Sequence, residues 1–309
     1  MPKFGFRVIT RDADDPLRWG QVIAQARAAE DAGFDRVIVS GDHVVFGEHL
    51  EAYGNPALGG RPGGKLDIGP DASFPDPVVA MAVLCAVTKR VRIMNSLMLA
   101  ALRRPIVLAK SVASLDAVSG GRIDLSVGIG WQREEYAAAG LAFNRRGWLL
   151  DHTLEVCQTL WRHSRASYSS PELSFEGIHM RPKPIQDGGV PLWISGTVNP
   201  GSMRRLARYG SGWNPWGDEQ DDVAAAIPRM REAVAALGRN PSDIEVIGHL
   251  PLVRDEDGQP DRDASMANLG RLVEAGVTNV DVFLPAPTEY DAAVDYLAPW
   301  AEAFRKALP

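Results

Sequence analysis

The chain has 309 residues, of which 45% are hydrophobic and 23% charged, and its formal net charge at pH 7 is −6. A chain of this length can bury one large core, and no linker or low-complexity segment divides it, so we expect a single domain over residues 1–309. The negative charge and scattered basic residues argue against nucleic-acid binding, and no apolar run reaches the roughly 18 residues of a membrane span. Residues 1–4 enter a predicted strand without a leader pattern, which predicts a soluble cytoplasmic protein.

The first helix and strand set a pattern that recurs along the chain. Asp15 and Pro16 supply an N-cap and a proline at the first helical position for a helix over 17–32, which Gly33 closes. The β-branched run over 37–39 then indicates a buried parallel strand. Similarly, Gly120 or Gly121 is expected to end a helix in the left-handed region just before the apolar run 123–127.

Eight strands and eight helices follow from this pattern. Strands are predicted at residues 4–9, 37–40, 91–97, 123–127, 192–195, 212–214, 244–249 and 280–284. Helices are predicted at about residues 17–32, 77–88, 105–118, 146–162, 200–208, 220–237, 264–275 and 289–306. The alternation predicts a (β/α)8 TIM barrel, which needs roughly 250 residues, and a doubly wound open sheet is the alternative.

The remaining length lies in three insertions. Residues 41–76 form a Gly/Pro-rich loop after strand two, and residues 128–145 form a loop with a short helix after strand four. Both follow the carboxyl ends of strands, where barrel active sites are built, so we expect them to act as walls or lids. Residues 163–190, after helix four, are expected to carry a small hairpin around 168–180.

The spacing of the cysteines and histidines argues against a disulfide and a metal site. Cys85 and Cys157 fall within apolar helical patterns, which favours buried free thiols over a disulfide or a metal site. No pair of histidines has a metal-ligand spacing such as His-x-x-x-His, so we expect no metal.

His43 is the first candidate catalytic residue, because it follows strand two immediately and an acid, Asp42, precedes it. A histidine on the carboxyl rim of a barrel can give or take a proton near neutral pH, and the acid can hold it or bind a polar cofactor edge. The alternative is that His43 only braces the loop. His249, at the end of strand seven, is expected to face the same cavity, whereas His152 and His163 are expected to be structural or solvated.

Two glycine-containing motifs follow other strands. Gly128, Gly130 and Trp131 come after strand four, where glycines let the backbone approach a planar or anionic ligand, although a tight turn is an equal interpretation. Ser195, Gly196 and Thr197 come after strand five and precede a helix near residue 200. Their amides and hydroxyls, together with the helix N-terminus, suit a phosphate, and an ordinary capped turn is the alternative.

Large aromatic and basic residues near strand ends are weaker candidates. Trp131, Trp213 and Trp216 can line a pocket for a flat heterocycle or belong to the core. Arg103 and Arg104 follow strand three and suit an anionic tail, or are solvated charges.

Taken in order, these motifs resemble the luciferase-like monooxygenase superfamily, and within it most closely the branch that uses the deazaflavin coenzyme F420. The resemblance covers almost the whole chain. The motifs that carry it are residues 42–44, 99–105, 115–122, 127–135, 145–147 and 191–196.

The resemblance implies a (β/α)8 barrel that binds an isoalloxazine-like ring over the carboxyl ends of its strands. It places Asp42 and His43 against the ring, with His43 as proton donor or acceptor. Residues 94–97, including Asn95 and Ser96, correspond to a bulged strand end that backs the ring, often with a non-proline cis peptide bond. By the same likeness, Gly128, Gly130 and Trp131 flank the ribityl chain, and Ser195, Gly196 and Thr197 take the phosphate.

The leading functional hypothesis from the resemblance is hydride transfer between F420 and a small organic substrate, with His43 as proton relay. An FMN-dependent monooxygenase supplied by a separate reductase is the first alternative. A non-catalytic F420- or flavin-binding protein is the second, since a fold does not fix a function. The resemblance also implies a homodimer.

Overall fold

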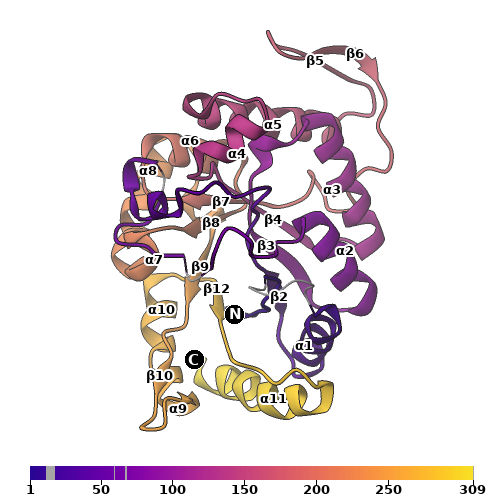
Figure 1. Cartoon of the computed structure of the whole chain (residues 1–309). Coiled ribbons are helices and arrows are strands. Elements are labelled where there is room, and N and C mark those ends of the chain that lie inside the picture. The colour runs from indigo at the N-terminus through magenta and orange to yellow at the C-terminus, as the bar shows by residue number, and fades with distance from the viewer. Residues whose placement is uncertain (12–17, 59, 67, 309) are drawn as a thin grey trace.

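Eight parallel strands close into a barrel in this computed structural model, which describes residues 1–11, 18–58, 60–66 and 68–308 (Figure 1). The strand order around the barrel is β1-β12-β9-β8-β7-β4-β3-β2, and every neighbouring pair is parallel. The predicted (β/α)8 barrel is therefore confirmed and the open sheet is wrong. The predicted helix start at Asp15 and Pro16 lies outside the described residues.

Each barrel strand overlaps one predicted strand. The barrel strands are β1 (Lys3–Arg7), β2 (Arg36–Val39), β3 (Arg92–Met98), β4 (Ile123–Val127), β7 (Leu192–Gly196), β8 (Gly212–Pro215), β9 (Glu245–His249) and β12 (Asn279–Val282). Alternate side chains of each strand point into the barrel. Ile38, Met94, Trp193 and Ile247 form one buried cluster from four of these strands, below the carboxyl ends.

The outer helices begin and end where local chemistry requires. They are α1 (Trp19–Asp31), α2 (Pro77–Val87), α3 (Pro105–Ser119), α5 (Arg146–Arg162), α6 (Pro200–Tyr209), α8 (Val223–Ala236), α10 (Leu269–Ala275) and α11 (Tyr290–Ala307). Side chains of Asp76 and Asn199 cap α2 and α6, each followed by a proline at the first turn. Gly120 ends α3 with φ of 72°, as the sequence predicts.

Two predicted helices are divided in the structure. Asp222 leaves helical geometry and caps the amide of Ala225, so 220–237 becomes α7 (Asp218–Asp221) and α8. A turn at 267–268 separates α9 (Arg262–Met266) from α10, where Asn268 and the nearby Gly270 are poor helix formers. The two-stranded sheet of β10 (Val253–Arg254) and β11 (Pro260–Asp261) was not predicted, because its strands are too short to show a period.

The three insertions take different forms. Residues 41–76 contain the 3₁₀ turns η1 (Leu50–Gly54) and η2 (Pro56–Leu58), and the loop after β4 contains α4 (Arg133–Ala138) and η4 (Phe143–Arg145). The expected hairpin is β5 (Ala166–Ser169) paired with β6 (Ser174–Ile178), and it projects away from the barrel (Figure 1). The remaining 3₁₀ turns are η3 (Ala100–Leu102) and η5 (Pro241–Asp243).

Both cysteines are buried and free, as predicted. Burial raises the pKa of the Cys85 thiol to about 11 and that of Cys157 to about 12, so neither is a reactive thiolate at neutral pH. None of the helices in the described part of the chain is long and apolar enough to cross a membrane.

Candidate active site

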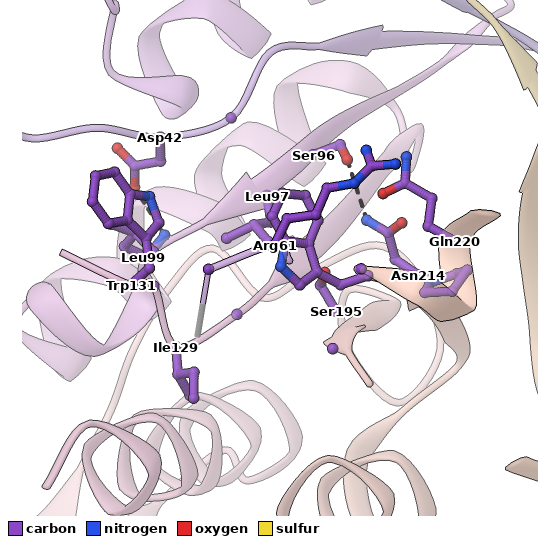
Figure 2. A pocket seen from close by; sticks show the side chains of 18 of the residues that line it. Asp42, Arg61, Ser96, Leu97, Leu99, Ile129, Trp131, Ser195, Asn214 and Gln220 are labelled. Atoms are coloured by element: carbon purple, nitrogen blue, oxygen red, sulfur yellow. Dashed lines mark hydrogen bonds between the residues drawn. The ribbon is translucent and has the colours of Figure 1, made fainter. Parts of the chain in front are cut away.

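A cavity of about 870 Å³ opens at the carboxyl ends of the barrel strands. Its walls come from the strand ends and from the loops after β2, β4, β7 and β8. In Figure 2, Asp42 and Trp131 lie on one side of the view, Ser96, Asn214 and Gln220 lie on the other, and Arg61 lies between them. This volume is enough for a cofactor-sized molecule and a small second ligand.

Inward-facing polar side chains near the ends of the barrel strands are joined by hydrogen bonds. Asn214 of β8 donates to the hydroxyls of Ser96 (3.2 Å) and Ser126 (3.1 Å), and Ser96 also accepts from Arg7 of β1 (3.3 Å). The peptide bond between Ser96 and Leu97 is cis, and the pairing of β3 with β4 shifts register between Asn95 and Met98. The strand end that the resemblance expected to be bulged is therefore irregular here.

Asn95 joins two neighbouring strands of the barrel. Its side chain is fully buried, donates to the Ser126 carbonyl oxygen (2.9 Å) and accepts from the Ser126 amide (3.1 Å). Its amide thus fastens β3 to β4, and Asn95 is not among the residues that line the cavity, so its contact with a cofactor stays a prediction.

His43 lies in the cavity wall with its side chain 14% exposed. Its Nδ1 is 3.3 Å from Oε1 of Glu135, a fully buried carboxylate that also accepts a hydrogen bond from the Val44 amide (3.0 Å). The rings of Phe46 and Phe74 surround the imidazole at centroid distances of 4.5 and 5.1 Å. Apolar rings therefore surround His43 at the rim, and one acid faces its Nδ1 outside hydrogen-bond geometry.

Asp42 does not supply that acid, although it is adjacent in sequence. Its carboxylate accepts from the Leu99 amide (2.9 Å) and from the guanidinium of Arg103, which also pairs with Asp76 at 2.7 Å. Burial lowers the pKa of Arg103, but hydrogen bonds and attraction to these aspartates outweigh burial and raise it. Asp42 thus anchors the loop that carries His43. Arg103 is neither solvated nor free to bind an anionic ligand, whereas Arg104 is exposed to solvent.

Glu135 was missed as a functional residue. The sequence placed it in the motif after β4 but gave no reason to prefer it over Glu134. Only the folded structure distinguishes Glu135, because α4 directs its side chain under the loop that follows β2.

The loop after β4 requires its glycines. A Cβ at Gly128 would stand 2.9 Å from a methyl of Leu97, and one at Gly130, where φ is 69°, would stand 2.9 Å from a methyl of Leu99. Trp131 is buried beside this backbone and lines the cavity, and its indole N–H has no hydrogen-bond partner in the part of the chain that the structure describes. A ligand in the cavity can supply the missing acceptor.

In the loop after β7, side-chain hydroxyls are more available to a ligand than backbone amides are. Ser195, Gly196 and Thr197 all line the cavity, but Asn199 already accepts from the first amides of α6, those of Gly201 (3.0 Å) and Ser202 (3.1 Å). Two of the amides at the N-terminus of α6 are thus already hydrogen-bonded within the chain. Ser195 and Thr197 remain as hydroxyl donors at the cavity.

Arg146 is a cavity residue for which the sequence assigned no chemistry. Its guanidinium donates to the carbonyl oxygens of Phe143 (3.2 Å) and Leu58 (3.4 Å), and among the described residues no carboxylate pairs with it. Burial, together with the nearby charge of Arg133, lowers its pKa from the ordinary value. An arginine stays protonated in proteins, so Arg146 is a half-buried cation suited to an anionic ligand.

The aromatic candidates divide into two groups. Trp131 and Trp216 line the cavity, and Tyr53 lies between them at centroid distances of 5.4 and 6.1 Å. Trp213 is fully buried and donates to the Gly196 carbonyl oxygen (2.9 Å), so it belongs to the core.

His249, His152 and His163 lie where the sequence predicts. His249 lines the cavity, whereas His152 bonds Tyr168 (2.9 Å) away from the site and His163 caps the C-terminus of α5.

The sequence model of the luciferase-like monooxygenase family matches residues 4–305. The chain belongs to this family. Among curated proteins, the chain is 30% identical to the uncharacterized protein Mb0978c of Mycobacterium bovis. The match covers 87% of this chain and 89% of that protein.

Solved structures share the fold of this luciferase-like protein. The monooxygenase RslO1 from Streptomyces bottropensis superposes with a TM-score of 0.74 at 18% identity, covering 98% of this chain and 99% of that one. An F420-dependent secondary alcohol dehydrogenase, in complex with an F420-acetone adduct, superposes with a TM-score of 0.75 at 17% identity and the same coverage. Family and fold together identify the chain as a luciferase-like enzyme.

Proposed function

We propose that the protein is an oxidoreductase that transfers a hydride between coenzyme F420 and a small organic substrate. The observation that carries the proposal is that one cavity combines an imidazole on one wall, a hydroxyl-lined loop on another, and a cation for which the described residues supply no carboxylate partner. A ring cofactor with an anionic tail needs these three features together.

The residues at the site fit such a cofactor. The glycine backbone at 128–130 and the indole of Trp131 leave a flat wall, and the unpartnered indole N–H is suited to a polar group of the ribityl chain. Ser195, Thr197 and Arg146 are suited to the phosphate.

The charge at the site suits the phosphodiester of F420. A phosphomonoester such as that of FMN carries about −1.5 to −2 at pH 7, whereas the phosphodiester of F420 carries a single charge. Arg61 and Arg205, two other arginines that line the cavity, already pair with Asp221 and Asp151. Among the described arginines that line the cavity, Arg146 and the exposed Arg11 have no carboxylate partner, and the half-buried Arg146 is suited to a singly charged phosphodiester.

When bound, F420 supplies a ring carbon that accepts or donates a hydride. In this proposal His43 holds the proton that is exchanged beside the ring, and Glu135 orients its imidazole through Nδ1. Aromatic residues around His43 exclude water from this part of the cavity.

Titrating the purified protein with F420 and with FMN tests the proposal. We expect F420 to bind with a shift in its absorbance band and FMN to bind more weakly. Tight binding of FMN alone would replace the proposal with an FMN-dependent monooxygenase. The homodimer and the separate reductase stay predictions.

A further inference from the structure

A second polar cluster lies in the cavity, on strands that do not carry His43. Asp281 of β12 is 2% exposed, and its carboxylate accepts from Nε of Arg7 at the end of β1 (2.5 Å) and from Nδ1 of His249 at the end of β9. Strand pairing sets this arrangement, because β12 lies between β1 and β9 and Asp281 is in register with His249. We refer to Arg7, Asp281 and His249 as the β12 triad.

The β12 triad keeps hydrogen-bonding capacity toward the cavity. Arg7 and His249 both line it, with side chains 26% and 25% exposed. Nδ1 of His249 is directed at Asp281, so Nε2 lies on the opposite edge of the ring, and it has no hydrogen-bond partner within residues 1–11, 18–58, 60–66 and 68–308. Arg7 uses Nε and Nη2 for Asp281 and Ser96, which leaves Nη1 as a donor.

The charge of the β12 triad indicates what it binds. The guanidinium of Arg7 and the carboxylate of Asp281 cancel, so with a neutral imidazole the group has no net charge. Arg11 also lines the cavity but is exposed to solvent. A neutral oxygen can accept from Arg7, and a hydroxyl can donate to Nε2 of His249. A carboxylate ligand would be repelled by the lone pair on Nε2 of His249 and by the nearby negative charge of Asp281.

Apolar side chains flank the β12 triad. Phe283 and Ile9 each follow a triad residue by two positions along the chain, line the cavity and are 49% and 46% exposed. Exposed apolar surface beside a polar group inside a cavity suits a ligand with an apolar body and one polar end.

We propose that the β12 triad holds the oxygen of a neutral, apolar-bodied alcohol or ketone, which is the substrate class of the enzyme. This inference rests on the proposed oxidoreductase function and adds the substrate class to it. Arg7 donates to the oxygen and His249 accepts from the hydroxyl form. On oxidation of the alcohol, the hydroxyl proton would pass to Nε2 of His249 and the hydride to the bound cofactor, while His43 holds the proton exchanged at the ring itself. Asp281 is a positioning residue that fixes the tautomer of His249.

The test uses three probes of matched size: cyclohexanol, cyclohexanone and cyclohexanecarboxylate. Each is added at pH 8 to the full chain with ¹⁵N-labelled histidine, first without cofactor and then with F420. We expect the two neutral probes to shift the His249 Nε2 resonance saturably, and the carboxylate to bind at least about tenfold more weakly.

Three variants assign the effect. His249→Phe keeps a ring of similar size without nitrogens, and we expect it to weaken binding of the neutral probes by about tenfold. His43→Phe is the matched substitution at the other imidazole and should leave the shift at His249 in place. Asp281→Asn is expected to change the His249 tautomer signature in the ¹⁵N spectrum.

The inference is overturned if the neutral probes leave the wild-type His249 resonance unmoved, or if the carboxylate binds as tightly as they do. These outcomes need no variant to fold. Because the first series contains no cofactor, its failure is distinct from a failure of F420 to bind, which would overturn the proposed function instead.

Discussion

At the scale of single residues, the proposed function depends on His43 and its buried partner Glu135. We expect His43→Ala to keep its affinity for F420 and to lose on the order of 10²-fold or more in turnover, because only the proton relay is removed. Glu135→Gln keeps an oxygen to accept from the Val44 amide but removes the charge facing Nδ1, so a smaller loss is expected. Binding titrations and steady-state kinetics on both variants measure this, and unchanged turnover in His43→Ala would reject the relay.

Arg146 gives a second prediction at this scale. We expect Arg146→Met to weaken F420 binding about 10- to 100-fold, because one hydrogen-bonded charge of the phosphate site is lost. Arg145→Met is the matched control, since Arg145 is adjacent but exposed and paired with Glu172 (2.6 Å). Equal losses in both variants, measured by equilibrium titration, would show that Arg146 does not bind the tail.

At the scale of elements, the loop after β4 is shaped by its glycines. Gly130 and Gly140 have nearly the same φ, 69° and 70°, but only a Cβ at Gly130 would contact another residue within 4 Å. We expect Gly140→Ala to lower the free energy of unfolding by about 1 kcal/mol, from backbone strain alone. Gly130→Ala should cost about 1 to 2 kcal/mol more, because Leu99 must move, and should also weaken cofactor binding.

Chemical denaturation of the two glycine variants, together with F420 titration, separates strain from packing. Equal losses of stability, with cofactor affinity unchanged in both, would mean that the loop adapts to a side chain at 130. In that case the close packing against Leu99 would not shape the cavity wall.

At the scale of the whole molecule, the β12 triad joins three barrel strands and links stability to pH. Burial by itself raises the pKa of Asp281, but the charges of Arg7 and His249 outweigh burial and lower it from 3.8 to about 2. A lowered pKa in the folded state stabilises the protein above the unfolded value, and this contribution is lost as the pH falls from about 4 toward 2. The shift corresponds to about 2 kcal/mol.

We therefore expect the difference in unfolding free energy between wild type and Asp281→Asn to narrow by about 1 kcal/mol from pH 6 to pH 3. Urea denaturation at both pH values measures it. A difference that stays constant over this range would show that the charged triad does not stabilise the barrel.

The fold was predictable because its signals are local. Runs such as 37–39 and 123–127 and helix ends such as Gly33 and Gly120 each specify an element within a few residues. The site was predictable only in part. The sequence shows which loops follow the strand ends, but it does not show which side chains from distant parts of the chain contact one another there. Sequence adjacency suggested Asp42 as the acid beside His43, whereas the fold brings in Glu135, and it removes Arg103 from the candidate anion site by pairing it with Asp42.

The central claim is that the cavity holds a deazaflavin ring beside His43, and a crystal structure of the complex with F420 tests it most directly. We predict the ring against Trp131 and the end of β3 at 96–97, with the phosphate within hydrogen-bond distance of Arg146 and of the hydroxyls of Ser195 and Thr197. A ring bound outside the cavity, or a phosphate remote from Arg146, would contradict the account.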